Sequence, residues 1–362
     1  MLGPWRAIVA LIAVGIVAGI GSALYRAHHS PPLVPLSYFH DEKVDFREAL
    51  AYWRSLIDEV GPDAAHNEFI KEGNTMKISE AHTLAHTFGE ALFDEEGIAG
   101  FGTCDDSFLY GCYHNFIGTA ISKIGLTALD EVVAQCEKKS PRDILSCKHG
   151  IGHALVGYLG YSLENLEKAL SMCSSLDYAS SWDGCFDGAF MEYNTNEMNA
   201  STKGDFTPRP LSSANAYTPC DSVSEELRAA CVYQLPFWYA RVSDPTPHDV
   251  NYRLEQIGLR CAGISTLWPL SRACFEGFGF ISVTMTNFDS DAAGAACRLA
   301  TTKYGERLSC LSGIARRLTY AGVSSQDSCS RLGLSEKGVA YCKEYADGDW
   351  QHIHTMPLPS FP

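Results

Sequence analysis

The sequence predicts an all-α protein of disulfide-stapled helical-hairpin repeats, forming an α-solenoid or a closed α/α toroid after an N-terminal transmembrane helix. Three observations lead to this fold class: fourteen cysteines in tandem pairs, a repeat of roughly 38 residues, and an apolar N-terminal segment. Members of a pair are 8 to 13 positions apart, and the second members follow one another at intervals of 32 to 46 positions. Such intervals are typical of stacked helical repeats. The pairs are Cys104/Cys112, Cys136/Cys147, Cys173/Cys185, Cys220/Cys231, Cys261/Cys274, Cys297/Cys310 and Cys329/Cys342.

The N-terminal segment Ala7–Leu24 contains 18 residues without a charge. This length is near the minimum that spans a bilayer and exceeds that of most signal-peptide cores. We therefore expect residues 1–26 to be a transmembrane anchor, or an uncleaved signal segment, that contacts the membrane through residues 7–24. A single-pass anchor of this kind predicts a C-terminal domain outside the cytoplasm, in a periplasm or at a cell surface.

Cysteine usage points to the same compartment. An even number of regularly spaced cysteines behind an export segment indicates disulfides formed in an oxidising environment. Zinc sites in a reducing cytosol are the competing interpretation, which is disfavoured because the sequence contains no Cys-x-x-Cys. Cys-x-x-Cys-His and a nucleotide-binding loop are also absent from the sequence, so neither haem nor a nucleotide is expected as a cofactor. The spacing favours pairing between sequence neighbours.

The charge balance restricts the choice of partner. With 28 basic and 43 acidic residues the net charge is −15, whereas binding to nucleic-acid phosphates requires a basic surface. Nucleic acid is therefore not expected, and the partner is either a small molecule or a protein.

The rest of the chain divides into a linker over residues 27–45, an extracytoplasmic helical-repeat domain over residues 46–348, and a tail over residues 349–362. The linker is rich in proline and histidine. Apolar residues at helical intervals predict a first helix over Phe46–Val60, and a second is expected over Asp63–Lys71.

Each repeat is expected to combine two kinds of helix. An amphipathic helix ends near the first cysteine of a pair, as in Leu126–Cys136 and Leu163–Cys173. A glycine-rich, more apolar segment opens at the second cysteine, as in Cys147–Leu159 and Cys274–Ile281. A helix that is apolar nearly all round is usually buried, so the glycine-rich helices should lie inside the array. The polar stretch Tyr193–Pro219 interrupts the period and is predicted to be a surface loop.

A column of polar residues appears when the inner segments are aligned on their second cysteine. The position two residues later always carries a hydrogen-bonding side chain, and the first half of the chain is rich in histidine there. In two segments a second histidine, His86 or His153, follows four residues later on the same helix face. Packed helix axes lie about 8 to 10 Å apart, so equivalent side chains on neighbouring helices can converge. Seven members of the column follow a second cysteine, namely His114, His149, Asp187, Tyr233, Glu276, Ser312 and Glu344. His82 is added from an earlier segment, Ala81–Leu92, which lacks the cysteine but repeats the spacing of His149 and His153 with His82 and His86.

Imidazole and carboxylate side chains on one surface suit a transition metal, namely zinc, iron, copper or manganese. Such a metal supports hydrolysis or, with iron or copper, redox chemistry. We expect two catalytic residues, Asp187 as a fourth ligand or orienting group and Glu192 as a general base. The expected metal ligands are His82, His86, His114, His149 and His153.

Two other functions stay open, and with them the question whether the protein is an enzyme. Repeat arrays often serve as non-catalytic scaffolds for a peptide, a glycan or a partner protein, and histidines in repeated positions also act as core hydrogen-bonding groups. A carbohydrate-active α/α-toroid enzyme would instead pair carboxylates among Asp187, Glu192 and Glu276, about 5 to 10 Å apart across an open cavity. The glycines that follow the column, such as Gly150 and Gly188, are predicted to be packing positions.

Overall fold

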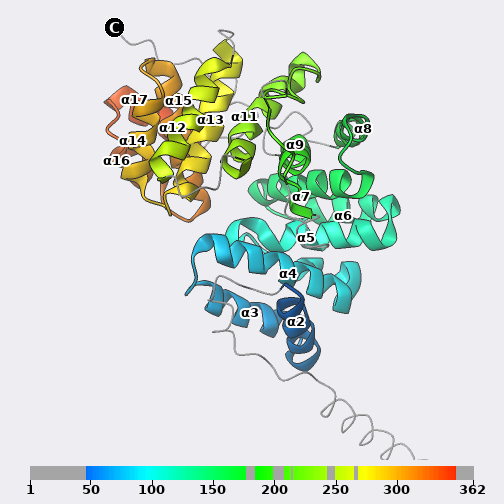
Figure 1. Ribbon diagram of the computed structural model, residues 1–362. Helices are drawn as coiled ribbons and strands as arrows, with labels where there is room; N and C mark the ends of the chain where they lie inside the picture. Colours follow the sequence, from blue (N-terminus) through cyan, green and yellow to red (C-terminus); the bar gives the residue numbers. More distant parts are fainter. Residues whose placement is uncertain are drawn as a thin grey trace, which may run out of the picture.

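The computed structural model describes residues 46–176, 184–198, 208–212, 215–242, 249–264 and 268–347. These residues form fifteen α-helices and two 3₁₀-helices, and no strand occurs among them (Figure 1). The all-α class is therefore confirmed, whereas the predicted anchor, linker and tail lie outside the described residues. Within the described ranges no helix is long and apolar enough to cross a bilayer.

The helices form two sets, and each helix of the inner set packs against the next inner helix along the chain. The inner helices are α4 (Ile78–Glu96), α5 (Ser107–Ile124), α7 (Pro141–Leu159), α9 (Cys185–Thr195), α11 (Glu225–Val242), α13 (Trp268–Met285), α15 (Tyr304–Tyr320) and α17 (Glu336–Asp347). The outer helices are α2 (Phe46–Val60), α3 (Pro62–Gly73), η2 (Gly97–Thr103), η3 (Leu126–Ala128), α6 (Leu129–Cys136), α8 (Leu163–Cys173), α12 (Val250–Gly263), α14 (Ser290–Ala300) and α16 (Ser325–Arg331).

The predicted division into outer and inner helices is confirmed, and α2 and α8 have the predicted bounds. The outer helix α8 buries one stripe of apolar residues, whereas the inner helix α9 is buried along nearly its whole length. The inner helices begin earlier than predicted: α7, α11, α13, α15 and α17 start six positions before the second cysteine. In α7 the start is set by Ser140, whose side chain accepts a hydrogen bond from the backbone of Asp143 and caps the helix.

All seven disulfides join the predicted sequence neighbours, and no cysteine is free. The Cα–Cα distances of 5.4 to 5.9 Å are ordinary for disulfides. Cys136 and Cys173 are the last residues of α6 and α8, and their partners lie on the inner helices α7 and α9. Each of these bonds therefore fastens the end of an outer helix to the next inner helix.

Glycines allow neighbouring inner helices to approach until their backbones touch. A Cβ atom on Gly188 of α9 would lie 1.9 Å from the carbonyl oxygen of His149 on α7. Reciprocally, a Cβ on Gly152 of α7 would lie 2.0 Å from the carbonyl oxygen of Cys185 on α9. No side chain tolerates such distances, so the predicted packing role of Gly188 is confirmed, and Gly152 has the same role.

The Gly188→Ala variant is expected to lose about 1 to 3 kcal/mol of unfolding free energy, because the added methyl group forces α7 and α9 apart. Urea denaturation of the oxidised protein measures the loss. The matched control is Gly102→Ala, whose added Cβ would have no atom within 4 Å, and it should stay within about 0.5 kcal/mol of wild type. Equal stability of the two variants would contradict the backbone contact.

The predicted surface loop begins later than the sequence suggests. Helix α9 continues through Tyr193 to Thr195, and both residues are buried. The chain then turns back because the carboxylate of Glu192 accepts a hydrogen bond from the backbone N–H of Met198 at 2.9 Å. This turn places Glu197, also buried, beside the inner helices.

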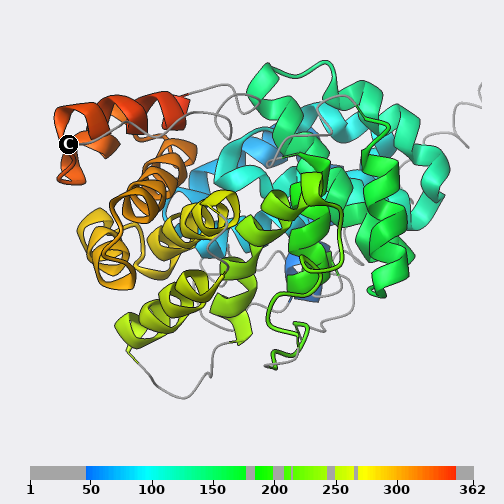
Figure 2. The same cartoon turned by 90° about the horizontal axis from the view of Figure 1, so that it is seen from above.

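The array curls so that its last helices come round toward its first ones (Figure 2). The rings of Tyr110 on α5 and Tyr320 on α15 lie 6.2 Å apart between centroids. Leu145 of α7 and Tyr345 of α17 belong to one buried cluster. The concave side of this curl is lined by the inner helices.

Candidate metal site and cavity

A cavity of about 380 Å³ lies between the inner helices, within the size range of small-molecule sites. Its wall has a polar part from the first half of the chain and a largely aromatic part from the second half. The polar part includes His82, His114, His149, Asp187 and Glu197, and the aromatic part includes Tyr233, Phe237, Phe280 and Tyr320.

The five histidines of the sequence analysis lie together in one cluster, with His114 at its centre. The ring centroid of His114 lies 5.5 Å from that of His82 and 5.4 Å from that of His86, both on α4. On the other side it lies 5.3 Å from His149 and 5.2 Å from His153, both on α7. Helix α5 therefore holds one histidine between two histidine pairs.

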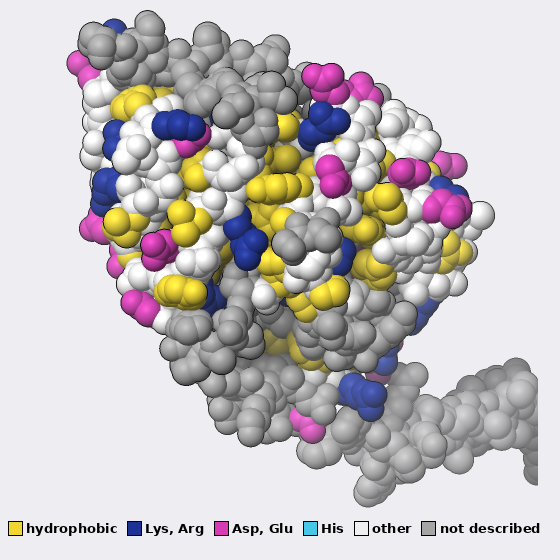
Figure 3. Space-filling view, turned by 45° about the horizontal axis from the view of Figure 1, so that its top comes forward, with side chains coloured by type: hydrophobic (Ala, Val, Ile, Leu, Met, Phe, Trp, Pro, Cys, Tyr) yellow, Lys and Arg dark blue, Asp and Glu magenta, His cyan; other side chains and the backbone are white. Residues whose placement is uncertain are grey.

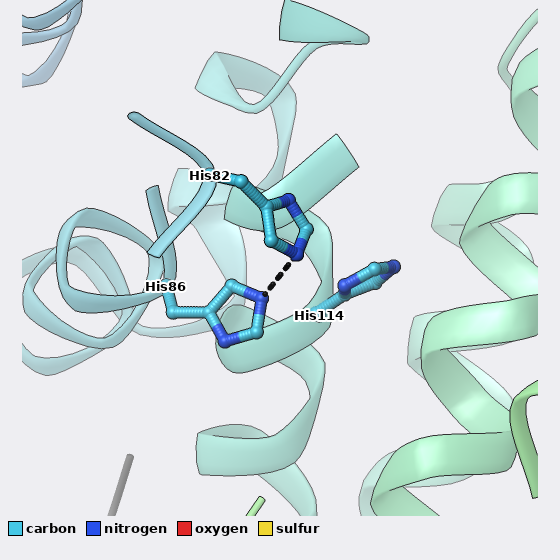
Figure 4. A group of neighbouring side chains, drawn as sticks. All are labelled: His82, His86 and His114. Carbon is cyan, nitrogen blue, oxygen red and sulfur yellow. Dashed lines mark hydrogen bonds between the residues drawn. The ribbon is translucent and has the colours of Figure 1, made fainter. Parts of the chain in front are cut away.

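Within each pair the two Nε2 atoms face each other. They are 3.2 Å apart between His82 and His86 (Figure 4) and 3.0 Å apart between His149 and His153. Two imidazoles bound to one tetrahedral ion at about 2.0 to 2.1 Å place their nitrogens roughly 3.3 to 3.4 Å apart. The 3.2 Å separation of the His82–His86 pair is close to this value, whereas the 3.0 Å separation of the His149–His153 pair is shorter and fits a shared proton better.

His82, His86 and His114 offer ligand nitrogens that all lie within 4.8 Å of one another, so this triad can hold a metal ion. Figure 4 shows the three rings around a common space. The Nδ1 atom of His114 is buried and has no hydrogen-bond partner among the described residues. Buried polar atoms are nearly always satisfied, so this nitrogen fits the role of a ligand.

The triad is kept in the neutral form that binds metals. Burial lowers the pKa of His82 and lowers the pKa values of His86 and His114 well below the ordinary value. Neighbouring histidines add to the lowering for His86 and His114, because a second positive charge in the cluster is unfavourable. Neutral imidazoles carry the lone pair that metal ligation requires.

A strained backbone turn fixes the orientation of His82. Phe108, Leu109 and Tyr110 at the start of α5 have φ angles of 49°, 60° and 62°. The left-handed conformation costs about 1 to 2 kcal/mol for each such residue. The turn directs the carbonyl oxygen of Phe108 to within 2.8 Å of His82 Nδ1, which donates to it and leaves Nε2 facing His86. Backbone strain of this kind gathers at functional sites.

His149 and His153 are each held by a carboxylate. His149 Nδ1 lies 2.8 Å from a carboxylate oxygen of Asp187, and His153 Nδ1 lies 2.8 Å from one of Glu192. Glu192 is completely buried and also accepts a hydrogen bond from the hydroxyl of Tyr161. Burial lowers the pKa of His153, but the hydrogen bond and charge of Glu192 outweigh it and raise that pKa overall. Carboxylates commonly orient histidines in this way at metal and catalytic sites.

The polar column follows the cavity only through the first half of the array. His82, His114, His149, Asp187 and Tyr233 line it, whereas Glu276 is fully buried and paired with Arg272 at 2.8 Å. Ser312 is buried too, and Glu344 is exposed. On the later helices the cavity-facing residues, Phe237, Phe280 and Arg317, stand six or seven positions after the second cysteine.

Sequence reasoning missed four charged residues of the cavity wall. Glu197 forms an ion pair with Arg241, and Arg253 and Arg317 complete the set. A usable signal existed for one of them: Arg317 follows Arg316 within an otherwise apolar inner segment. Glu197 gave no such signal because it lay in a stretch predicted to be a surface loop.

The Glu197→Gln variant is expected to lose about 1.5 to 3 kcal/mol of stability at pH 7, because a buried charged hydrogen bond to Arg241 is lost. Burial raises the pKa of Glu197, but Arg241 and nearby histidines outweigh it and lower the pKa to about 2. Because the folded-state pKa is lowered, this stabilisation is present above about pH 4.5 and disappears as the pH falls toward 2.

Urea denaturation at several pH values measures the unfolding free energy of wild type and of Glu197→Gln. The difference between the two should decrease as the pH falls below 4.5. The control is Glu167→Gln at an exposed position on α8, whose unfolding free energy should equal that of wild type at every pH. A free-energy difference between wild type and Glu197→Gln that stays constant down to pH 2 would contradict the ion pair.

Comparison of the chain with protein-family models, with curated proteins and with solved structures gives no match in any of the three. Fold and site together define the class: an all-helical protein stapled by seven disulfides, with a histidine triad that can hold a metal ion.

Proposed function

We propose that the protein binds a transition metal ion through His82, His86 and His114 and uses it in a reaction on a small molecule held in the cavity. The observation that carries this proposal is the group of three ring nitrogens within 4.8 Å, from the half-buried His82 and the buried His86 and His114, of which His82 and His114 line the cavity. Zinc is the first candidate, since three histidines with one open position are a common catalytic zinc site. Iron, copper and manganese accept the same donors.

The metal supplies Lewis-acid chemistry at the cavity wall. In this proposal His149 lines the cavity and is held at Nδ1 by Asp187, so the proton that it exchanges with the substrate is the one at Nε2. The same Nε2 lies 3.0 Å from that of His153, so the two rings share this proton until the substrate replaces His153 as its partner. Glu192 is fully buried behind His153, so we assign it to holding that ring rather than to contacting substrate.

The test is elemental analysis of the full chain, produced oxidised and without a histidine tag. Wild type is expected to hold close to one equivalent of a transition metal, and His82→Ala/His86→Ala is expected to hold none while keeping its helical circular dichroism. His66→Gln changes a histidine outside the cluster and should keep the metal. Wild-type protein that stays metal-free after reconstitution with each of the four metals would refute the proposal and favour the non-catalytic scaffold.

The carbohydrate-enzyme alternative has little support from the carboxylates that suggested it. Of the three, only Asp187 lines the cavity, and it is paired with His149. Glu192 and Glu276 are fully buried, held by His153 and Arg272. No pair from this set faces another across the open space.

We also propose that residues 7–24 anchor the protein in a membrane and that the repeats form a solenoid of about one turn on its oxidising side. Seven disulfides support the oxidising compartment. The Tyr110–Tyr320 contact between α5 and α15 supports the single turn. Membrane fractionation of the full chain against a chain without residues 1–26 tests the anchor, since only the full chain should sediment with membranes.

A further inference from the structure

Two arginines of the cavity wall lack a carboxylate partner among the described residues. Arg317 of α15 donates from Nε to the hydroxyl of Thr284 at 3.1 Å, and its guanidinium lies over the ring of Phe280 at 4.8 Å. Arg253 of α12 donates to the carbonyl oxygen of Ala240, and its Nε is buried without a hydrogen-bond partner. Both guanidinium groups therefore keep donors available for a ligand.

Two other arginines of the inner helices have a carboxylate partner, whereas the buried Arg316 lies over the rings of Tyr233, Tyr320 and Tyr345. Arg241 is paired with Glu197, and Arg272 with Glu276. A desolvated cation without a counter-ion is unfavourable, and burial lowers the pKa of Arg317 to about 10. A bound anion would remove this cost, and guanidinium groups match the oxygens of carboxylates and phosphates in a bidentate manner.

The rest of this side of the cavity is mainly apolar, although Gln234, Thr284 and the paired Arg241 also line it. Tyr233, Phe237, Phe280, Met285 and Tyr320 line it. Figure 3 shows a face of the molecule on which hydrophobic side chains gather in the middle beside Lys or Arg side chains. Aromatic walls with a few convergent polar groups are the ordinary construction of small-molecule sites.

We propose that the cavity binds an amphiphilic anion, a molecule with an apolar or aromatic body and one carboxylate or phosphate group, whose oxygens are held by Arg317 and Arg253. The inference deepens the proposed function by naming its substrate class, and it rests on that function only for the reaction. The anion would lie near the histidine triad, because Arg317 and His82 line the same cavity. The charge of Arg317 also contributes to the lowered pKa of His82.

The test is isothermal titration calorimetry on the full oxidised chain after chelation of metals, with decanoate, decyl phosphate, decanol and decyltrimethylammonium as probes. At least one of the two anions is expected to bind at least tenfold more tightly than decanol, and the cation should not bind. Arg317→Gln should weaken binding of the anion at least tenfold while leaving decanol unchanged. Arg317→Lys should recover part of the loss, and Arg298→Gln, an exposed position on α14, should bind like wild type.

The preferred anion identifies the head group, since the alkyl chains of decanoate and decyl phosphate differ by only one carbon. Decanol binding as tightly as both anions, an unchanged Arg317→Gln, or no binding of any probe would each overturn the inference. Because metals are removed first, this result is independent of the metal analysis. A protein that binds the anion but no metal refutes only the proposed function, and one that binds metal but no anion refutes only the substrate class.

Discussion

Full reduction of the seven disulfides is expected to unfold the protein in native buffer. Closing a loop of 8 to 13 residues stabilises the folded state by about 2 to 4 kcal/mol in the chain-entropy description. Seven such contributions together match or exceed the about 5 to 15 kcal/mol by which folded domains are ordinarily stable. The helices α6, α8, α14 and α16 are short, and isolated helices of their length are marginal in water.

Circular dichroism after reduction and alkylation of the thiols measures this effect, with alkylated oxidised protein as the control. The reduced sample should lose its cooperative thermal transition and most of its helix. A reduced protein that still melts cooperatively near the temperature of the oxidised one would show that packing of the inner helices alone sustains the fold.

His114→Ala is expected to weaken metal binding more than any other single change in the cluster. This residue belongs to the triad and is the one histidine in ring contact with both pairs. Loss of a hydrogen-bond partner of a metal ligand typically costs about 10- to 100-fold in affinity, and loss of a ligand should cost more. His149→Ala, outside the triad, is expected to weaken binding less than tenfold.

Competition with a chelating dye, using zinc as the probe, gives both affinities, and circular dichroism verifies that each variant folds. Equal losses in His114→Ala and His149→Ala would place the ion across all five histidines. A larger loss in His149→Ala would move it to the α7 pair, whose Nε2 atoms are 3.0 Å apart.

The architecture was largely predictable because its signals are local. Cysteine spacing identified all seven disulfides, since a partner 8 to 13 residues away is within reach whatever the rest of the chain does. The start of α7 was misplaced because its capping residue Ser140, and not Cys147, determines where this helix begins.

The candidate site was predictable where equivalent positions of successive repeats face the same cavity. It was not predictable where the curvature of the array brings other positions of the repeat to the cavity. Equivalent positions from His82 to Tyr233 line the cavity, which alignment on the second cysteine can find. Farther along, the cavity is lined by residues four or five positions after the column, such as Phe280 and Arg317. This shift of the cavity-lining position along the helices results from the packing geometry of many helix pairs. The spacing of residues in the sequence does not change with it, so the sequence alone cannot predict it.

The same local pairing has a consequence for how the chain is made. Because every disulfide joins cysteines within one hairpin, each bond needs only residues that leave the ribosome, or cross a membrane, within the same short interval. Loops of this length close in about 10 to 100 ns, far faster than the chain grows at about 5 to 20 residues per second. Where each pair is oxidised before the next pair emerges, the native pairing forms without reshuffling, whereas in refolding from the reduced state all fourteen thiols compete at once.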